Sequence, residues 1–359
     1  MERDRMTTLG HGGNIKHLAK ISGRPAGDIL DFSANINPLG PPEWVLPLIS
    51  ARFRDMEHYP DPDCSSLIEA MTERYGVSRD QLIVGNGSTE ILYLLPRVLS
   101  SRLAVIPVPS YLDYSRVARL TGLPVKTIPL KEEKAFKPDI EDIAALLVED
   151  CMVFLGQPNN PTGILYETNG LRALARKHPS AIFVVDEAFA DFVENMDSII
   201  CNRPPNVVVL LSLTKIFAMP GLRLGCAVAD ADIIRRLKEI QPPWSVNAFA
   251  QMVGEYALRD RDYLNKSRSH VSEQRQHLID RLLVMGCFTV YPGAANYLLV
   301  RIDRTGVGAS AIAAKLLADG IAIRLCQNFE GLDERFFRIA VRTEWENATL
   351  LASLAKIMD

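Results

Sequence analysis

The chain has 359 residues, of which 48% are hydrophobic and 23% charged, so it can bury one large core and a smaller one beside it. Its 40 lysines and arginines nearly balance 43 acidic residues, and the net charge of -3 argues against a nucleic acid or an anionic membrane as partner. The charged opening residues and the lack of a long apolar stretch predict no signal peptide, no membrane span and a cytoplasmic protein. A small molecule is the expected ligand.

The cysteines are widely spaced along the chain. They form no C-x-x-C pair, and no histidine stands at metal-ligand spacing from them. We therefore expect reduced, mostly buried thiols and no metal site. These residues are Cys64, Cys151, Cys201, Cys226, Cys287 and Cys326.

Near the amino end, an H-G-G-N-I motif at residues 11–15 precedes a polar loop around Asn35. Paired glycines let the backbone approach a ligand closely, and Asn with Pro and Gly marks a loop with exposed polar groups. His11 and Asn35 are therefore candidates for ligand binding, with an N-terminal arm made only of turns as the alternative. A Pro-rich loop at 58–63 carries Tyr59, for which packing against the body is the alternative to a binding role.

Apolar runs and helical patterns alternate through the middle of the chain. Such alternation predicts right-handed crossovers and a mostly parallel sheet flanked by helices, which places this chain in the α/β class. The expected strands span 81–84, 103–107, 125–129, 151–155, 181–186 and 206–211, and the expected helices begin at 91 or span 115–121 and 140–147.

A glycine-rich turn at 85–90 stands between the first of these strands and a helix start. Exposed backbone N–H groups and the positive end of the helix together predict an anion site there. Its candidate ligands are Gly87, Ser88 and Thr89. The turn lacks the full G-x-G-x-x-G fingerprint, which disfavours a nicotinamide dinucleotide.

Two other strand ends carry candidate site residues. Tyr111 follows the strand at 103–107 and could stack on a planar ring, with packing at a helix start as the alternative. Asp186 ends a fully apolar strand, and because an unpaired buried carboxylate is costly, it needs a cation nearby. The alternative for Asp186 is a structural cap on the strand.

The most informative stretch follows the β-branched run at 206–211. Lys215 should emerge at the carboxyl end of that strand, where open α/β sheets place their ligands. A lysine beside buried apolar surface loses hydration, which favours its neutral, nucleophilic amine. Ser212, Thr214 and Arg223 add two hydroxyl groups and a cation that suit a dianionic phosphate. The alternative is a surface lysine at a strand end.

Beyond Gly225 the pattern turns helical up to Ile240, and a long helical region at 251–285 leads out of the large domain. The rest of the chain mixes short apolar strands with two helices, which predicts a small α+β domain. Arg324 and Arg338 lie in or end such strands, where a buried guanidinium requires an anion. The anion could be part of a substrate or an acidic side chain in a structural ion pair, and the sequence leaves both alternatives open.

The S-x-T-K motif ending at Lys215, the R-x-G motif after it and the N-P-T-G string at residues 160–163 resemble fold-type I pyridoxal-phosphate enzymes of the aminotransferase superfamily. The resemblance implies that Lys215 bonds to the aldehyde of pyridoxal 5′-phosphate and that Asp186 faces its ring nitrogen. It implies that Asn160 binds the phenolic oxygen. Many relatives have Tyr where this chain has Phe189, so Asn160 would act without that hydroxyl.

The same resemblance assigns roles outside the central strands. It places Tyr111 on the cofactor ring, Tyr59 across a homodimer at the cofactor phosphate of the partner subunit, and Arg338 at the substrate carboxylate. The implied architecture is an N-terminal arm at 1–40, a large cofactor-binding domain at 41–250, a connecting helical region at 251–285 and a small C-terminal domain at 286–359.

Within the superfamily, the chain is most similar to the threonine-phosphate decarboxylase subgroup of cobalamin biosynthesis, which is built on a histidinol-phosphate aminotransferase plan. The motifs special to that subgroup lie at residues 11–15, 31–38, 243–247 and 291–297, and Phe189 agrees with them. The implied reaction converts L-threonine O-3-phosphate into (R)-1-amino-2-propanol O-2-phosphate and carbon dioxide. The enzyme alternative is an aminotransferase of the histidinol-phosphate type, and a non-catalytic regulator is disfavoured by the intact Lys215.

The substrate anions have several candidate ligands on this reading. Arg324, Arg338 and His11 would share the carboxylate and the phosphate, with Asn35 and Asn160 beside them. The sequence leaves open how these residues divide the two anions. It also leaves open decarboxylation against transamination, and threonine phosphate against a related phospho-amino acid.

Overall fold

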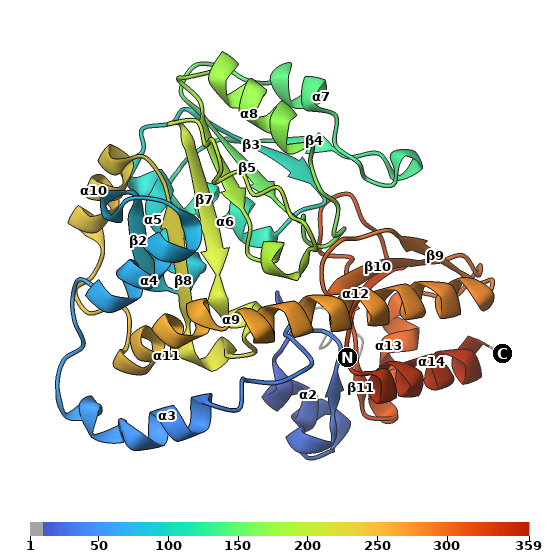
Figure 1. The fold of residues 1–359 in the computed structure, drawn as a ribbon. Helices are drawn as coiled ribbons and strands as arrows, with labels where there is room; N and C mark the ends of the chain where they lie inside the picture. Colours follow the sequence, from blue (N-terminus) through green and yellow to red (C-terminus); the bar gives the residue numbers. More distant parts are fainter. Residues whose placement is uncertain (1–9, 359) are drawn as a thin grey trace.

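A computed structural model describes residues 10–358 of the chain (Figure 1). The first nine residues of the predicted arm, with the charged opening, therefore lie outside the described residues. The described part of the arm contains helix α2 (Ile15–Ser22) and strand β1 (Leu30–Asp31), so it has regular structure besides turns. In residues 10–358 no helix is long and apolar enough to cross a membrane, and the cytoplasmic location stays a prediction.

A seven-stranded sheet forms the centre of the large domain (Figure 1). Its strands are β2 (Leu82–Asn86), β3 (Leu103–Val108), β4 (Val125–Pro129), β5 (Cys151–Gly156), β6 (Ile182–Asp186), β7 (Val207–Ser212) and β8 (Leu224–Val228). They lie in the order β2-β8-β7-β6-β5-β3-β4. The five strands from β7 to β4 are parallel, whereas β8 is antiparallel to both of its neighbours. The predicted mostly parallel sheet is confirmed.

Strand β8 differs from the prediction, which had a helical pattern directly after Gly225. The strand continues to Val228, and the predicted helix follows as α10 (Ala231–Ile240). The five residues of β8 include Gly225 and Ala227, which are poor strand formers, so the run carries little strand signal of its own. Burial between β2 and β7 decides its conformation.

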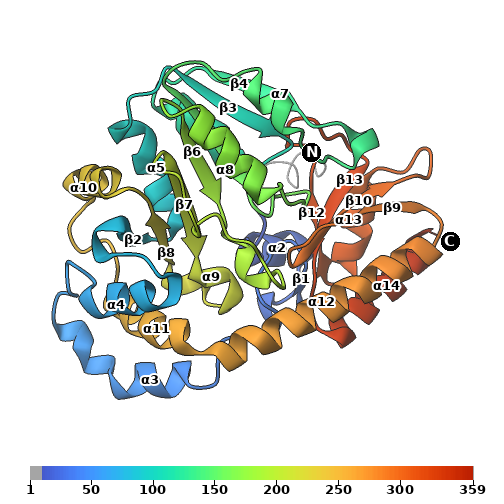
Figure 2. The same cartoon turned by 45° about the horizontal axis from the view of Figure 1, so that its top comes forward.

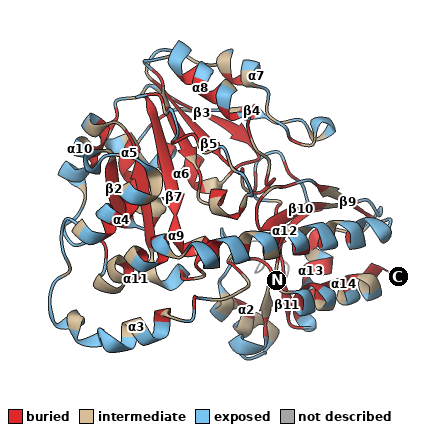
Figure 3. Ribbon diagram, in the orientation of Figure 1, coloured by how far each residue is buried: buried red, intermediate tan, exposed pale blue. Residues whose placement is uncertain are grey.

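Helices cover both faces of this sheet. On one face, Val207, Val209 and Leu211 of β7 share a core with α4 (Ser65–Tyr75), α8 (Thr168–Lys177) and α11 (Ala248–Arg259). On the other face, Val208 and Leu210 pack with α5 (Ser88–Val98), α6 (Leu112–Leu120) and α10. Figure 3 shows the strands buried and the outer sides of the helices exposed. Burial on both faces explains the continuous apolar runs in the sequence.

The predicted helical region after residue 250 consists of two helices. Helix α11 ends at Arg259, and α12 (Arg261–Val284) begins after Asp260, whose carboxylate accepts a hydrogen bond from the Tyr263 N–H at 3.0 Å. An acidic N-cap of this kind favours a new helix start. Helix α12 then runs from the large domain to the small one, where it packs on β9 (Phe288–Tyr291) and α14 (Glu344–Met358) (Figure 2).

The C-terminal part is a small α+β unit, as predicted. Its antiparallel sheet has the strand order β12 (Arg324–Leu325), β13 (Phe336–Ala340), β10 (Tyr297–Ile302) and β9, and it packs with helices α13 (Ala309–Ala318) and α14. The arm joins this unit, because β1 pairs in parallel with β11 (Ile321–Ala322). The domain boundaries stay a prediction. Two further helices are α3 (Val45–Ala51) and α7 (Ile140–Ala144).

Four of the six cysteines are buried, in agreement with the prediction of mostly buried thiols. They are Cys64, Cys151, Cys226 and Cys326.

Candidate active site

Most of the predicted site residues meet at the carboxyl ends of β5, β6 and β7. Two adjoining cavities lie there, and they share Tyr111, Asn160, Phe189 and Lys215. The inner cavity is also lined by Ser88, Thr89, Tyr114 and Asp186. The outer cavity, of about 570 Å³, is also lined by His11, Asn35, Arg324 and Arg338.

Lys215 lies on the short helix α9 (Leu213–Ile216), which begins directly after β7. The loop of Asn37 holds this turn, because the Asn37 N–H donates to the Lys215 carbonyl at 3.1 Å and its side-chain amide donates to the Ile216 carbonyl at 2.6 Å. Burial lowers the pKa of the Lys215 amine to about 8, and the positive charges of Arg223 and Arg338 act in the same direction. About one tenth of the amine is therefore neutral at pH 7, far more than for an exposed lysine.

Asp186 ends β6 beside Lys215 in the inner cavity. Its carboxylate accepts hydrogen bonds from the Tyr114 hydroxyl at 2.9 Å and from the Ala188 N–H at 3.0 Å. Burial raises the pKa of Asp186, although both hydrogen bonds and the Lys215 charge oppose the rise. No described residue forms an ion pair with Asp186, so the carboxylate can accept a cation from a bound group.

Tyr114 was missed in the sequence. It lies three residues after Tyr111 on the first turns of α6, and its ring is buried while its hydroxyl reaches Asp186. The sequence contained a pattern that could have identified Tyr114. Residues three apart on a helix share a face, and a buried carboxylate such as Asp186 requires a hydrogen-bond donor.

The predicted anion site has the geometry of a backbone cradle. Gly87 has φ +76°, and a Cβ atom there would lie 2.5 Å from Nη2 of Arg223. A Cβ atom on Gly225 would lie 2.2 Å from the Ser88 nitrogen. Both glycines are thus required for α5 to begin against β8 with Arg223 at its positive end. The Ser212 and Thr214 hydroxyls lie 2.9 Å apart next to this turn.

Glu90 points away from the cradle. Its carboxylate accepts hydrogen bonds from the Asn86 N–H at 2.8 Å and from the Gln241 side chain at 3.1 Å. No described residue forms an ion pair with Arg223. The cradle therefore keeps a net positive character that suits a phosphate group.

Asn160 lies between the two cavities. Its side-chain oxygen accepts a hydrogen bond from Nη1 of Arg338 at 2.5 Å. Its loop is fixed by the small domain, because the Ala294 N–H donates to the Gly163 carbonyl at 2.7 Å. A Cβ atom on Gly163 would lie 2.7 Å from Cα of Gly293, so the two loops touch through bare backbone.

Arg324 and Arg338 are opposite each other on β12 and β13, and both are buried. Their guanidinium groups donate to neutral oxygens, and no acid among the described residues pairs with either of them. The structural ion pair considered for them is therefore wrong within the described chain. Burial lowers the pKa of Arg324 to about 10 and also lowers that of Arg338, since each cation lacks a counter-ion.

His11 and Asn35 both line the outer cavity, so the structure brings them to the site. The Asn35 side-chain oxygen is buried and has no hydrogen-bond partner in the described chain. Phe189 lies under Lys215, with Nζ 5.9 Å from the ring centroid. The Phe189 ring also packs edge-on against Tyr297, with 5.0 Å between the ring centroids.

Tyr59 lines neither cavity of its own chain. It is 80% exposed and stacks on Trp244, with 4.7 Å between the ring centroids. The predicted role across a dimer interface stays a prediction.

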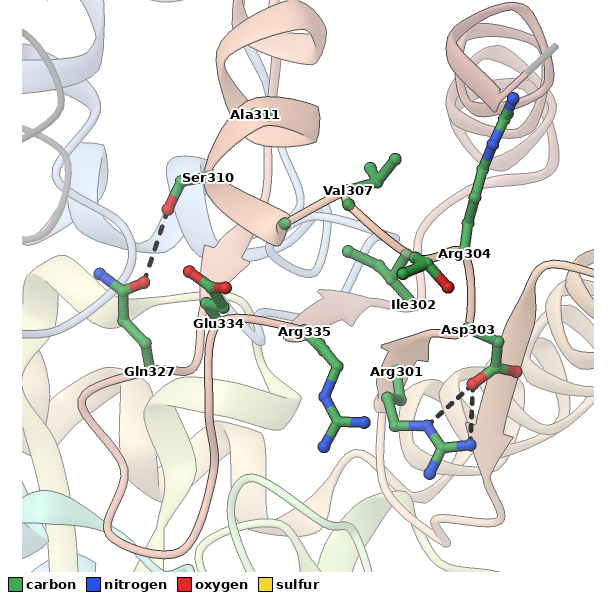
Figure 4. Close-up of a pocket in the computed structure, with 13 residues that line it drawn as sticks. Arg301, Ile302, Asp303, Arg304, Val307, Ser310, Ala311, Gln327, Glu334 and Arg335 are labelled. Atoms are coloured by element: carbon green, nitrogen blue, oxygen red, sulfur yellow. Dashed lines mark hydrogen bonds and ion pairs between the residues drawn. The ribbon is translucent and has the colours of Figure 1, made fainter.

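A third hollow lies on the small domain between β10 and α13 (Figure 4). Arg301 forms an ion pair there with Asp303, and Arg335 forms one with Asp333, which does not line the hollow. These acids neutralise Arg301 and Arg335. This hollow therefore attracts an anion less strongly than the site of Arg324 and Arg338 does. Among residues 10–358 there is also no group of three His, Cys, Asp or Glu side chains that could hold a metal ion.

Comparison with known proteins agrees with this geometry. The family described as Aminotransferase class I and II matches residues 27–354. The chain belongs to that family. Its fold is the fold-type I architecture, as predicted. The chain is 37% identical to a threonine-phosphate decarboxylase of Salmonella typhimurium, with 97% of this chain and 96% of the relative covered.

Two other similarities complete the comparison. The chain is 36% identical to the adenosylcobalamin biosynthesis bifunctional protein CobDQ of Leptospira interrogans, and it spans 97% of its own length but 41% of that relative. The crystal structure of histidinol-phosphate aminotransferase from Clostridium acetobutylicum superposes with a TM-score of 0.85 at 30% identity, covering 92% of this chain and 99% of that one.

Pyridoxal 5′-phosphate is the cofactor, and the described residues fit it. The cradle at the start of α5 suits its phosphate, the unpaired Asp186 suits its ring nitrogen, and the neutral amine of Lys215 suits its aldehyde. Tyr111 lines the inner cavity, where an aromatic ring can stack on a planar group.

Proposed function

We propose that this protein decarboxylates L-threonine O-3-phosphate to (R)-1-amino-2-propanol O-2-phosphate and carbon dioxide, as a step of cobalamin biosynthesis. The observation that carries the proposal is the pair of buried arginines without an acid partner, on the wall of the cavity that also contains Lys215. Two free guanidinium groups suit a ligand with two anionic groups. The Salmonella typhimurium relative at 37% identity, a threonine-phosphate decarboxylase, supports threonine phosphate as that ligand, and the Leptospira interrogans relative at 36% identity supports a role in cobalamin biosynthesis.

Each site residue has a role in the proposal. Arg324, Arg338 and His11 bind the carboxylate and phosphate of the substrate, and Asn35 and Asn160 orient it between them. Gly87, Ser88, Thr89, Ser212, Thr214 and Arg223 hold the cofactor phosphate, while Tyr111 covers the ring. When bound, the cofactor withdraws electrons from the substrate α-carbon, and Asp186 strengthens this effect by keeping the ring nitrogen protonated.

Lys215 completes the reaction. The bond between Cα and the carboxylate carbon breaks and carbon dioxide leaves. The electron pair of the broken bond stays on Cα. The Lys215 ammonium then gives a proton to Cα, for which its position at the junction of both cavities is suitable. The bond that breaks is the one held perpendicular to the ring, so the placement of the two anions selects decarboxylation.

The deciding experiment is incubation of the holoenzyme with threonine phosphate and no keto acid. We expect one carbon dioxide released for each aminopropanol phosphate formed, and no change when 2-oxoglutarate is added. The Lys215→Ala protein is the matched control and should release carbon dioxide on the order of 10³-fold more slowly. A strict requirement for 2-oxoglutarate, with turnover of histidinol phosphate, would replace the proposal with the aminotransferase alternative, which the 0.85 TM-score of the Clostridium acetobutylicum enzyme favours.

We also propose that the enzyme is a homodimer with shared sites. Four large aromatic side chains from the segments around α3 and α11 are between 49% and 80% exposed, and we call them the aromatic face: Phe53, Tyr59, Trp244 and Tyr256. They come from α11 and from the loops around α3 and before α11, and Tyr59 stacks on Trp244. An exposed cluster of this kind is costly in a monomer, and a second copy would cover it.

Subunit mixing tests the shared site. Lys215→Ala subunits lack the reactive amine, and Tyr59→Phe subunits lack the hydroxyl that reaches the partner's cofactor phosphate. A hybrid dimer has one site with both groups, so the mixture should gain activity over either parent at low cofactor concentration. Sedimentation showing a fully active monomer would contradict the proposal.

A further inference from the structure

Asp113 is a buried carboxylate at the rim of the site that the mechanism above does not use. It lies in the first turn of α6 and is only 4% exposed. The Tyr111 hydroxyl donates a hydrogen bond to Oδ2 of Asp113 at 2.8 Å, and Nε2 of His11 lies 3.5 Å from Oδ1. The carboxylate thus stands between a residue of the inner cavity and a residue of the arm.

The electrostatic surroundings keep Asp113 ionised. Burial alone would raise its pKa, but the hydrogen bonds from His11 and Tyr111 and the charges of His11 and Arg116 hold the pKa below its usual value. Arg116 lies farther from the carboxylate, because its side chain is 64% exposed and its Nη1 is 4.0 Å from Oδ1. Nε2 of His11, 3.5 Å from the same oxygen on a side chain that is 48% exposed, is the nearer of these two groups.

The two partners of Asp113 belong to different parts of the site. Tyr111 lines both cavities, whereas His11 lines only the outer one. Their rings lie 5.7 Å apart. The segment around His11 is held on both sides, since Arg324 donates to the Gly10 carbonyl at 3.0 Å and the Gly13 N–H donates to the Ser33 hydroxyl at 2.9 Å.

We propose that Asp113 is a positioning residue. It fixes the Tyr111 ring and the His11 imidazole relative to each other. In this way it couples the stacking of Tyr111 on the cofactor to the closure of the arm over the outer cavity. The part of the inference that concerns substrate rests on the proposed function. The part that concerns the arm and the ring does not, because both contacts are made by this chain alone.

The first test measures the arm directly. In Asp113→Ala protein, hydrogen–deuterium exchange of the amides at residues 10–16 should become at least about fivefold faster, because a charge-assisted contact is lost. The near-ultraviolet and visible circular dichroism of the bound cofactor should weaken, since Tyr111 is no longer held. Arg116→Ala on the same helix is the matched control and should change neither signal.

Kinetics and a double-mutant cycle separate positioning from loss of folding. Asp113→Ala should raise KM for threonine phosphate about tenfold with a smaller change in kcat, and Asp113→Glu should recover part of the loss. In a His11→Ala background, Asp113→Ala should have little further effect on arm exchange. Full additivity, or wild-type exchange and dichroism in Asp113→Ala, would overturn the inference. A holoenzyme that shows the coupling but releases no carbon dioxide would refute only the proposed reaction.

Discussion

Replacing Lys215 with Ala should abolish covalent capture of the cofactor and lower turnover on the order of 10³-fold, since the variant loses both the nucleophile and the proton donor. After reconstitution with pyridoxal phosphate and borohydride reduction, mass spectrometry should find the modification on Lys215 of the wild-type protein. Lys238→Ala, an exposed lysine on α10, should behave as wild type. A modified residue other than Lys215 would contradict the assignment.

The pH dependence of capture adds a second measurement. Burial gives Lys215 of the apoprotein a pKa of about 8, so its neutral fraction rises roughly tenfold between pH 7 and pH 9 and then levels off. The rate of capture should follow this curve. An exposed lysine, with a pKa of about 10.4, would give a rate that is still rising steeply at pH 9. The shape of the curve therefore distinguishes a buried amine from a surface one.

Asp186→Asn should lower turnover by about 10² to 10³-fold while some cofactor binding remains, because the amide keeps the size of the carboxylate but cannot stabilise a protonated ring nitrogen. Tyr114→Phe is the matched control. It removes only the hydroxyl that donates to Asp186 at 2.9 Å, so its effect should be much smaller. Turnover near the wild-type level in Asp186→Asn would refute the role of the charge.

The same substitution should stabilise the apoprotein. Burial raises the pKa of Asp186 in the folded state, so the folded protein binds more protons than the unfolded chain and loses stability as pH rises from the unfolded pKa through the folded one. Asparagine removes this loss. The Tm of apo Asp186→Asn should therefore exceed that of the apo wild type, by more at pH 8 than at pH 4. An equal difference at both pH values would contradict the explanation.

The sequence predicted the parts of the fold that repeat a strong local pattern. Four of the seven central strands, β3, β5, β6 and β7, carry continuous apolar runs, because helices cover both sides of the sheet there. Strand β8 includes Gly225 and Ala227, so its conformation depends on neighbours that are distant in sequence. The pairing of β1 with β11 depends even more on tertiary contacts, since each strand has two residues.

The site was predictable where a residue type is costly to bury. Asp186, Arg324 and Arg338 stood out because a charge in or at the end of an apolar strand requires a partner, and Lys215 stood out because it follows an apolar strand directly. Tyr114 was missed because a tyrosine in a helix is compatible with simple packing. The other missed residue, Asp113, follows the candidate Tyr111 by two positions, and only the folded structure shows that the arm brings His11 to it.

The pairing of β1 with β11 has a consequence for synthesis on the ribosome. Leu30 pairs with Ile321 and Asp31 with Ala322, so the second strand leaves the ribosome nearly 300 residues after the first. Chains emerge from the amino end and domains fold as units, so the large domain can fold while residues 30–31 still lack a partner. The arm, and with it His11, would then take its place at the active site only when translation is almost complete. An incomplete chain could have a folded sheet and Lys215 in place but would lack the outer cavity.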